Sequence, residues 1–384
     1  MTENRLQHAE TIDDGRAVAV TWTSGRRARF HAVWLRDNAL DAASRDTSNG
    51  QRLVTLGDQP AAPRIGSAGV APDGGLDCEM QPEARRFLYP ADWLERHIYD
   101  CDDPQQAGRI EDHLQIWDAG LEGGPLAPLS WDAVARDDAA LADWLERVRR
   151  YGFARLCDVP VTSGAVCEVV SRFGFVRETN YGRWFDVRAT PNPVNLADTA
   201  RGLQAHTDNP YREPVPTLQL LHCLENDVRG GANRLVDGFA LALRLQREAP
   251  EAFELLTRYS ARFEFAGTAE VCLRARRPLI QCDADGLLRG ICFNNRSAAP
   301  LTDIPYSAMP AYYGAIRHFA ALLDDPAMSV SFLQEPGDLF IVDNRRVLHA
   351  RDVYEGGGTR WLQGCYADMD GLTSRLNVLR QRVA

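Results

Sequence analysis

Apolar residues between positions 16 and 93 occur in short runs that are separated by turn-forming residues. Three such runs are RAVAVTW at 16–22, RRARFHAVWL at 26–35 and RLVTL at 52–56, and the glycine-rich stretch APDGGLDCEM follows at 71–80. Short apolar runs bounded by Gly, Pro, Asn and Asp are typical of β-strands joined by turns. The pattern predicts a small β-rich N-terminal domain over residues 1–105.

The composition changes in the next segment. Residues 103–130 are enriched in Gly, Pro and polar residues and show no sustained period, which is typical of a linker. We therefore predict a linker over residues 106–130 and a second domain over residues 131–384.

The second domain begins with a helical pattern and continues mainly with strands. Apolar residues recur at helical spacing from Leu141 to Val148, Gly152 stands at the expected C-cap, and a second amphipathic helix is predicted over 309–323. The strand-like runs are VPTLQLLHCL (215–224), ARFEFAG (261–267), MSVSFL (328–333) and DLFIVDN (338–344). With far more strand than βαβ alternation, we predict a mainly β fold, a sandwich or a barrel, with helices packed outside it.

Composition and charge narrow the class of protein. The 384 residues carry 43 Lys and Arg against 53 Asp and Glu, a formal net charge of −10, which disfavours nucleic acid and anionic membranes as partners. The N-terminus has no apolar signal region, and no apolar run approaches the roughly 18 residues of a membrane span. Nine cysteines without a C-x-x-C pair indicate reduced thiols. We expect a cytoplasmic protein that acts on a small molecule.

Two histidines and one aspartate are the strongest candidates for chemistry. His206 and Asp208 are alternate residues of an extended segment, so their side chains point the same way, and His349 follows the strand-like run at 338–344. Two His and one carboxylate that leave three coordination positions open form the facial triad of non-haem Fe(II) oxygenases. Zinc is the rival metal, but hydrolytic zinc sites of this composition usually carry a helical HExxH motif, which is absent from the sequence.

Arg360 adds a third element to this pattern. It lies 11 residues after His349, in the strand-like run TRWLQGCYADM at 359–369. A guanidinium fixed near the iron can form a bidentate ion pair with the distal carboxylate of a keto-acid cosubstrate.

In this order, His206-x-Asp208, His349 and Arg360 resemble the pattern of the iron and 2-oxoglutarate dioxygenases related to taurine dioxygenase. Over nearly its full length the chain is similar, more narrowly, to the γ-butyrobetaine hydroxylase branch. The motifs that carry this resemblance are WLRDN (34–38), GQRL (50–53), YPADWL (89–94), NYG (180–182), AHTDNP (205–210), QLLHC (219–223), FNN (293–295), PGD (336–338) and YADMDGLTSRLNVLRQRV (366–383).

The resemblance implies a double-stranded β-helix (jelly-roll) catalytic domain, a β-rich N-terminal domain and a homodimer. It implies that His206, Asp208 and His349 bind Fe(II), that 2-oxoglutarate and O2 are cosubstrates, and that ascorbate serves as a reductant. Arg360 is implied to hold 2-oxoglutarate. Asn233 stands where relatives have a Ser or Thr that helps to hold the same carboxylate.

Members of this branch often carry a structural zinc in the N-terminal domain, and here the chain departs from the pattern. The zinc ligands are Cys residues right after WLRDN and a His shortly before ADWL. This sequence has Ala39, Asp41 and Ser44 in the first stretch and Arg85 in place of the His. We therefore predict no structural zinc and an N-terminal domain that folds on its apolar core.

The resemblance also implies how the substrate is held. Tyr181, Trp184 and Tyr366 match aromatic positions that surround a trimethylammonium group, to which rings are attracted by cation–π interactions. Asp198 stands where relatives have another Tyr, and it can favour a cation by charge. Asn195 and Asn295 match positions that bind the acid end of γ-butyrobetaine. Further candidates for that end are Asn209, which replaces a Tyr of relatives, and the nearby cations Arg201, Arg183 and Arg296.

The additional hydrogen-bond donors of these arginines favour a substrate whose acid group carries more negative charge than a carboxylate. The carbon that is hydroxylated in γ-butyrobetaine is the second from nitrogen, and in 2-(trimethylammonio)ethylphosphonate that carbon bears the phosphorus. One cage and one metal position therefore serve both molecules. We predict hydroxylation of the phosphonate at this carbon, with γ-butyrobetaine hydroxylation to carnitine as the alternative.

Other interpretations of these residues remain. Tyr181, Trp184 and Tyr366 are also consistent with ordinary core aromatics, Arg183 and Arg296 with ion pairs at the surface, and His222 with a packed strand residue. A different class of protein, a non-catalytic module that binds a quaternary ammonium compound, would keep the fold without the reaction. The intact triad and Arg360 argue against that class.

Overall fold

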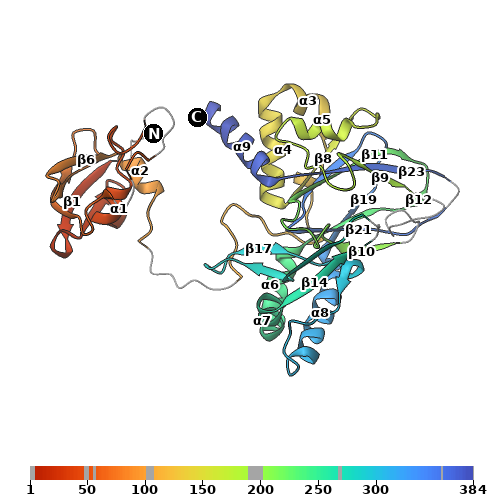
Figure 1. Ribbon diagram of the computed structural model, residues 1–384. Helices are drawn as coiled ribbons and strands as arrows, with labels where there is room; N and C mark the ends of the chain where they lie inside the picture. The colour runs from red at the N-terminus through yellow and green to blue at the C-terminus, as the bar shows by residue number, and fades with distance from the viewer. Residues whose placement is uncertain are drawn as a thin grey trace. The chain divides into compact units, whose positions relative to one another are not determined.

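The computed structural model describes residues 5–46, 52–54, 58–100, 108–188, 202–266, 270–355 and 358–383. The chain divides into two compact units, Met1–Pro104 and Gln105–Ala384 (Figure 1). Each unit has its own apolar core, so each is described by itself.

The smaller unit is built from two three-stranded antiparallel sheets. One has the order β1 (Leu6–Ile12), β2 (Ala17–Trp22) and β3 (Arg27–His31), and the other has β4 (Arg64–Val70), β5 (Leu76–Gln81) and β6 (Arg85–Tyr89). Helices α1 (Ala32–Asp37) and α2 (Ala91–Arg96) complete it. The alternating buried positions of β2 and β5 supply the core, in which Trp22 and Leu76 are fully buried.

Two of the short runs in this unit differ from expectation. The run at 26–35 is not one strand, because β3 ends at His31 and helix α1 begins at Ala32. Within the run at 52–56, residues 52–54 form an isolated bridge and a bend, with Arg52 opposite Arg45, and residues 55–57 lie outside the described residues. Packing explains the first difference, since Ala32 and Leu35 of the helix are both buried in the unit's core.

A polar cluster lies where relatives were expected to carry zinc ligands. Arg85 donates from Nη2 to Asp41 Oδ1 at 3.0 Å, Ser44 Oγ donates to Asp41 Oδ2 at 2.9 Å, and the backbone N–H of Ala43 donates to Asp41 Oδ1 at 3.1 Å. Ala39 is buried in the apolar core. We call Asp41, Ser44 and Arg85 the N-terminal polar cluster.

The larger unit contains two facing sheets of a jelly roll, which confirms the expected mainly β fold. The six-stranded sheet has the order β7 (Leu129–Ser130), β8 (Phe153–Cys157), β20 (Leu339–Asp343), β11 (Leu218–Asn226), β23 (Arg360–Ala367) and β9 (Phe185–Arg188). The four-stranded sheet has the order β10 (Leu203–His206), β21 (Val347–Arg351), β13 (Asn233–Asp237) and β19 (Ser329–Phe332). Side chains from both sheets, among them Phe340 and Leu235, form one apolar cluster between them.

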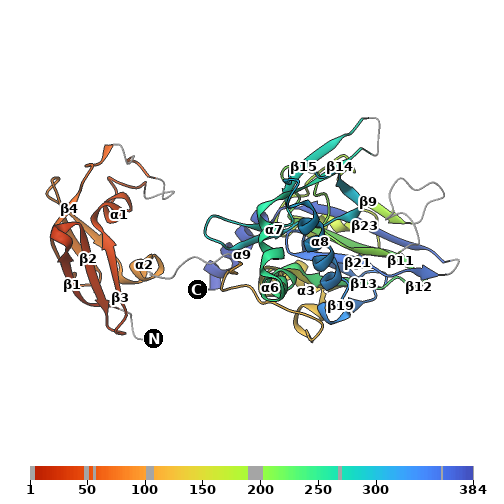
Figure 2. The same ribbon diagram turned by 90° about the horizontal axis from the view of Figure 1, so that it is seen from below.

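Helices cover the outer faces of the two sheets (Figures 1 and 2). The six-stranded sheet is covered by α3 (Trp131–Arg136), α4 (Asp138–Tyr151), α5 (Ala165–Ser171) and α9 (Met369–Val383). The other group is α6 (Gly238–Glu248), α7 (Pro250–Arg258) and α8 (Met309–Leu323). The helix predicted over 309–323 is α8. None of the helices in the described part of the chain has the length and apolar character needed to cross a bilayer.

Three further groups of short strands belong to the larger unit. They are β12 (Arg229–Gly230) with β22 (Tyr354–Glu355), β14 (Ser260–Phe265) with β15 (Leu273–Pro278) and β18 (Ala298–Ala299), and β16 (Ile280–Cys282) with β17 (Leu288–Ile291). Short 3-10 turns lie at η1 (Asp13–Gly15), η3 (Gly124–Leu126), η5 (Asn295–Ser297) and η6 (Pro326–Met328).

The segment expected as a linker makes buried contacts with the larger unit. Trp117 is buried, and its indole Nε1–H donates to the backbone oxygen of Tyr151 at 2.6 Å. The buried Arg346 donates to the backbone oxygen of Gln115 at 2.6 Å and forms an ion pair with Asp237. Gly and Pro content indicates irregular backbone but not the absence of packing, so these contacts were not visible in the sequence.

Candidate active site

Antiparallel pairing of β10 with β21 brings two histidines together. His206 is the last residue of β10 and lies directly opposite His349 of β21. The centroids of the two imidazole rings are 4.4 Å apart, and both side chains are at most 10% exposed. Residues 143 positions apart in the sequence therefore meet because their strands are neighbours in one sheet.

The hydrogen bonds of His206 fix which ring nitrogen carries the proton. Its Nδ1 lies 2.8 Å from the backbone oxygen of Gln204, which can only accept, and its Nε2 lies 2.7 Å from Nη2 of Arg296, which can only donate. The contact with Gln204 places a proton on Nδ1 of His206. This tautomer leaves the Nε2 lone pair available to a metal, and the backbone oxygen orients the ring.

Asp208 is held in place from three directions. Its Oδ2 accepts hydrogen bonds from Gln219 Nε2 at 2.5 Å and from the Tyr366 hydroxyl at 2.9 Å. The side chain of Asn344 accepts from the backbone N–H of Asp208 at 2.6 Å and donates to its backbone oxygen at 3.0 Å. Oδ1 is left facing the histidines, 3.4 Å from His206 Nε2 and 3.9 Å from His349 Nε2.

Burial and charge keep Asp208 and His349 in the forms that bind a metal. Burial alone would raise the pKa of Asp208, but its interactions with His206 and His349 hold that pKa well below its usual range, so the carboxylate is ionised. Burial, together with the neighbouring His206, lowers the pKa of His349 to about 3, so this imidazole is neutral. A metal ligand must be deprotonated, and near neutral pH these two groups are.

The geometry of the three side chains fits one metal ion. Their candidate ligand atoms all lie within 4.8 Å of one another. Ligands about 2.1 Å from one ion and at right angles to each other lie about 3 Å apart, so small side-chain movements close the triad around an ion. Two imidazoles and one carboxylate are the donor set of a facial non-haem iron site.

Arg296 also lies in this site. In the sequence it was one of several candidates for binding the acid end of the substrate. It belongs to η5, and its guanidinium donates to the same His206 nitrogen that a metal would use. A guanidinium and a metal ion cannot share one lone pair, so metal binding requires Nη2 of Arg296 to move off His206. A cation is thereby left beside the metal position.

Arg360 and Asn233 come together across the two sheets, as the resemblance implied. Arg360 begins β23 and Asn233 begins β13, and Nη2 of Arg360 donates to Oδ1 of Asn233 at 3.4 Å. Arg360 is 6% exposed, and its Nε has no hydrogen-bond partner within the described ranges. Burial and the charge of Arg351 lower the pKa of Arg360 to about 10. A buried cation with spare donors fits a carboxylate ligand.

The structure brings together two of the three predicted cage aromatics. The ring of Phe185 lies 6.1 Å from that of Tyr181 and 5.1 Å from that of Tyr366, so these three form one wall. Trp184 has no ring contact with them in the described part of the chain. Its indole is 39% exposed and lies beside Gly164. Neighbouring residues of an extended chain point to opposite sides, and here Phe185 takes the inner side.

The residues predicted for the acid end divide into three groups. Asn209 is 3% exposed; its Oδ1 accepts from the Tyr211 hydroxyl at 2.7 Å and its Nδ2 lacks a partner among the residues described. Asn295 is exposed on η5, next to Arg296. Arg183 interacts with the thiol of Cys167 on α5. Asn195, Asp198 and Arg201 lie outside the described residues.

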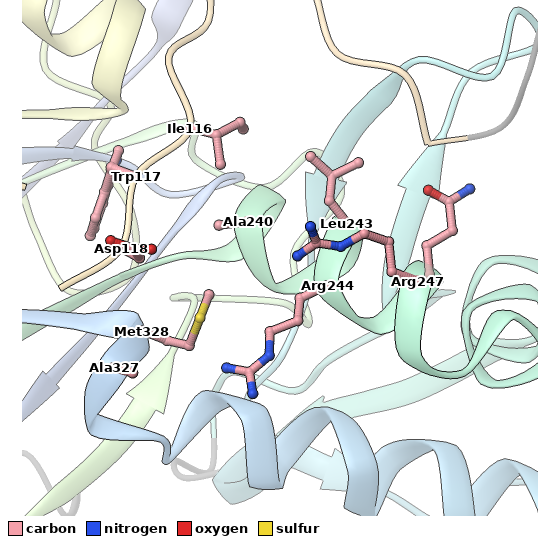
Figure 3. A pocket seen from close by; sticks show the side chains of 10 residues that line it. Ile116, Trp117, Asp118, Ala240, Leu243, Arg244, Arg247, Ala327 and Met328 are labelled. Atoms are coloured by element: carbon pink, nitrogen blue, oxygen red, sulfur yellow. The ribbon is translucent and has the colours of Figure 1, made fainter. Parts of the chain in front are cut away.

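One cavity in the described structure lies away from the triad. It measures about 670 Å³ and is bordered by α6, by η6 and by the segment at 116–118 (Figure 3). None of the predicted site residues lines it. A second cavity, of about 250 Å³, lies next to Asp208 on the side of Thr207 and Asn344. The site is therefore identified by side chains that can bind a metal ion, and not by the volume of a cavity.

Sequence reasoning missed two residues that position Asp208. Gln219 and Asn344 are 3% and 1% exposed, and each interrupts or ends an apolar strand run, LQLLHCL and DLFIVDN respectively. A polar side chain inside a buried strand needs a hydrogen-bond partner. That rule marks both residues as candidates, although it does not identify their partner.

The chain is similar to several known proteins. The sequence profile of the family described as "Taurine catabolism dioxygenase TauD, TfdA family" matches residues 120–366. The chain is 36% identical to a γ-butyrobetaine dioxygenase of Pseudomonas sp. (strain AK-1), over 95% of this chain and 94% of the relative. It is 30% identical to the human γ-butyrobetaine dioxygenase, over 98% of each chain. A solved asparagine oxygenase with Fe(II) is 20% identical, with a TM-score of 0.49 over 60% of this chain and 80% of that one.

Proposed function

The chain belongs to the TauD/TfdA family of dioxygenases, and on that premise we propose that it hydroxylates a short acid carrying a trimethylammonium group. As a member of this family it is an Fe(II)- and 2-oxoglutarate-dependent dioxygenase. Relatives over nearly the full length are γ-butyrobetaine dioxygenases and trimethyllysine dioxygenases. Both named substrates bear a trimethylammonium group, which supports this substrate class.

In this proposal His206, Asp208 and His349 bind the iron through Nε2, Oδ1 and Nε2. Bound Fe(II), with 2-oxoglutarate and dioxygen, supplies the oxidation of a C–H bond to an alcohol. Gln219 and Tyr366 occupy Oδ2 of Asp208 and so direct Oδ1 to the metal. Arg360, with Asn233, binds the distal carboxylate of 2-oxoglutarate.

The aromatic wall of Tyr181, Phe185 and Tyr366 binds the ammonium end. Each ring that faces a desolvated cation contributes roughly 0.5–2 kcal/mol. Tyr366 also donates to Asp208, so the wall begins at the metal ligands. This places a cation at a fixed distance from the metal, which selects the carbon that reacts. Trp184 and Asp198 remain predicted additions to the wall.

One observation carries the choice of acid. The guanidinium of Arg296 contacts a metal-ligand nitrogen directly, and Asn209, which follows Asp208 in the chain, has an Nδ2 without a hydrogen-bond partner among the described residues. Donors this close to the metal suit an acid group on the reacting carbon itself. We therefore favour 2-(trimethylammonio)ethylphosphonate, hydroxylated at the carbon bonded to phosphorus. Asn195, Asn295 and Arg201 are the other residues proposed for this end.

The second candidate is γ-butyrobetaine, favoured by the 36% identity to a dioxygenase of that name. Its carboxylate is one bond farther from the reacting carbon, so it would lie farther from Arg296. Both candidates use the same wall and the same metal position.

A substrate screen tests the proposal. Purified protein is incubated with Fe(II) and 2-oxoglutarate and with the phosphonate, γ-butyrobetaine or trimethyllysine, and mass spectrometry detects a gain of one oxygen. The phosphonate is expected to have the highest kcat/KM. If kcat/KM is at least tenfold higher for γ-butyrobetaine, about 1.4 kcal/mol in transition-state binding, the phosphonate assignment is wrong and the carnitine-forming alternative holds. Oxygenation of none of the three would overturn the substrate class.

We further propose that the protein is a homodimer and that its β-rich N-terminal unit folds without zinc. The resemblance supports the dimer, and light scattering of the full chain tests it. The N-terminal polar cluster supports folding without zinc, because Arg85 and Ser44 already donate hydrogen bonds to Asp41.

A further inference from the structure

A second buried arginine lies beside Arg360 and was not singled out in the sequence. Arg351 ends β21 and is 5% exposed. It is two residues from His349, so both side chains leave the strand on the same face. Its Cα partner on β13 is Asn233, the residue that accepts a hydrogen bond from Arg360.

The two guanidiniums approach each other from opposite sheets. Arg351 belongs to the four-stranded sheet and Arg360 to the six-stranded sheet. The guanidinium carbon of Arg351 lies 5.1 Å from the centre of the Tyr354 ring, and that of Arg360 lies 5.9 Å from it. The positive charge of Arg351 is one cause of the lowered pKa of Arg360, after burial. The ring of Tyr354 is therefore shared by two cations, while Asn233 accepts a hydrogen bond from Arg360 and is the strand partner of Arg351.

Two buried like charges repel each other. An anion between the guanidiniums converts the repulsion into two attractions. A carboxylate also has lone pairs enough for donors from both sides. The spacing fits as well, since two residues along a strand span about 6.6 Å, comparable to the length of a five-carbon chain whose other end is at the triad.

We infer that Arg351 is the second guanidinium of the site for the distal carboxylate of 2-oxoglutarate, opposite Arg360. This inference rests on the proposed function, in which Arg360 and Asn233 hold that carboxylate. Arg351 acts there as a binding residue for the cosubstrate, not as a ligand of the metal.

The test compares two keto acids that differ only in the distal carboxylate. Dissociation constants of 2-oxoglutarate and of 2-oxopentanoate are measured by calorimetry, without oxygen and with Mn(II) in place of Fe(II). The variants are Arg351→Met and Arg351→Lys, and Arg234→Met is the matched control. Arg234 neighbours Asn233 on β13 and forms an ion pair with Asp352, so its removal changes the net charge equally.

We expect Arg351→Met to weaken binding of 2-oxoglutarate by about tenfold or more, the usual cost of losing a charged hydrogen bond. Binding of 2-oxopentanoate should change by less than about twofold, and Arg351→Lys should lie between wild type and Arg351→Met for 2-oxoglutarate. Arg234→Met should match wild type for both acids.

Equal weakening of both keto acids, or no weakening of either, would overturn the assignment of Arg351. Should Arg351→Met not fold, the difference between the two acids in Arg351→Lys decides in the same way. Failure of the proposed function is distinguishable, because then the wild-type protein itself would not prefer 2-oxoglutarate to 2-oxopentanoate.

Discussion

Two polar clusters of this protein are built from similar residues but differ in how they are satisfied. In the N-terminal polar cluster, Asp41 accepts hydrogen bonds from Arg85, Ser44 and the backbone of Ala43. We call this cluster closed, because its carboxylate is satisfied by neighbouring groups of the protein. At the triad and around Arg360, several buried polar atoms remain without a partner in the described structure. They are Nδ1 of His349, Nε of Arg360 and Nδ2 of Asn209.

This difference indicates which of the two clusters binds a metal ion or an anion. Burying a polar atom without a partner costs free energy, so a closed cluster is stable alone while an open one gains from a metal ion or an anion. The open cluster is also the more deeply buried, with Arg360 at 6% exposure against 43% for the side chain of Arg85. Changes at the open cluster should therefore affect function, and changes at the closed cluster should affect only stability.

The largest effect is expected at the triad. His349→Ala removes one of three metal ligands, and we expect turnover to fall by at least about a thousandfold because the metal chemistry is lost. His222→Ala is the matched control, since His222 is also fully buried but lies outside the triad. It should cost stability without removing iron. A wild-type rate for His349→Ala with iron bound would contradict the assignment.

A smaller effect is expected at Arg360. Arg360→Lys keeps the charge but loses the planar fork, so the KM for 2-oxoglutarate should rise by about tenfold or more, while iron affinity stays near that of wild type. Steady-state kinetics and a metal titration measure the two quantities. An unchanged KM would count against this role.

Asn209 tests the acid end of the substrate. Asn209→Tyr restores the bulk that relatives are expected to have, and it removes the free Nδ2 donor. We expect kcat/KM to fall about tenfold for the phosphonate and less for γ-butyrobetaine. Equal losses for both substrates would remove Asn209 from the specificity argument.

The smallest effect is expected at the closed cluster. Arg85→Ala removes a half-exposed ion pair, which is worth about 0.2–1 kcal/mol, and should leave kcat unchanged. Burial would raise the pKa of Asp41, but its hydrogen bonds to Ser44 and Ala43 and the charge of Arg85 lower it overall. A lowered folded-state pKa gives stability that is present above the unfolded value, near pH 4, and is lost as the pH falls below it.

Denaturant unfolding of wild type and Arg85→Ala at pH 7 and pH 3 measures this contribution. The difference between the two proteins should be present at pH 7 and should shrink at pH 3. A difference that grows as the pH falls would show that the sign is wrong.

Sequence patterns predicted the parts of this molecule that depend on local spacing. Helix α8 matches its predicted range because its apolar period is long, and the pair His206 and Asp208 was visible because only one residue separates them. The resemblance predicted the meeting of Arg360 with Asn233, which lie 127 residues apart. Contacts between strands that are far apart in the chain could not be predicted from local sequence patterns. Asn344 is 136 residues from Asp208, and the orientation of Trp184 depends on which side of the chain faces inward.

Metal analysis of the full-length protein tests the contrast between the two clusters most directly. The protein is loaded with Fe(II) without oxygen, and bound iron and zinc are counted for wild type, Asp208→Ala and Asp41→Ala. We predict about one iron per chain in wild type and in Asp41→Ala, none in Asp208→Ala, and no zinc in any of them. About one tightly held zinc per chain that disappears in Asp41→Ala, or iron retained by Asp208→Ala, would contradict it.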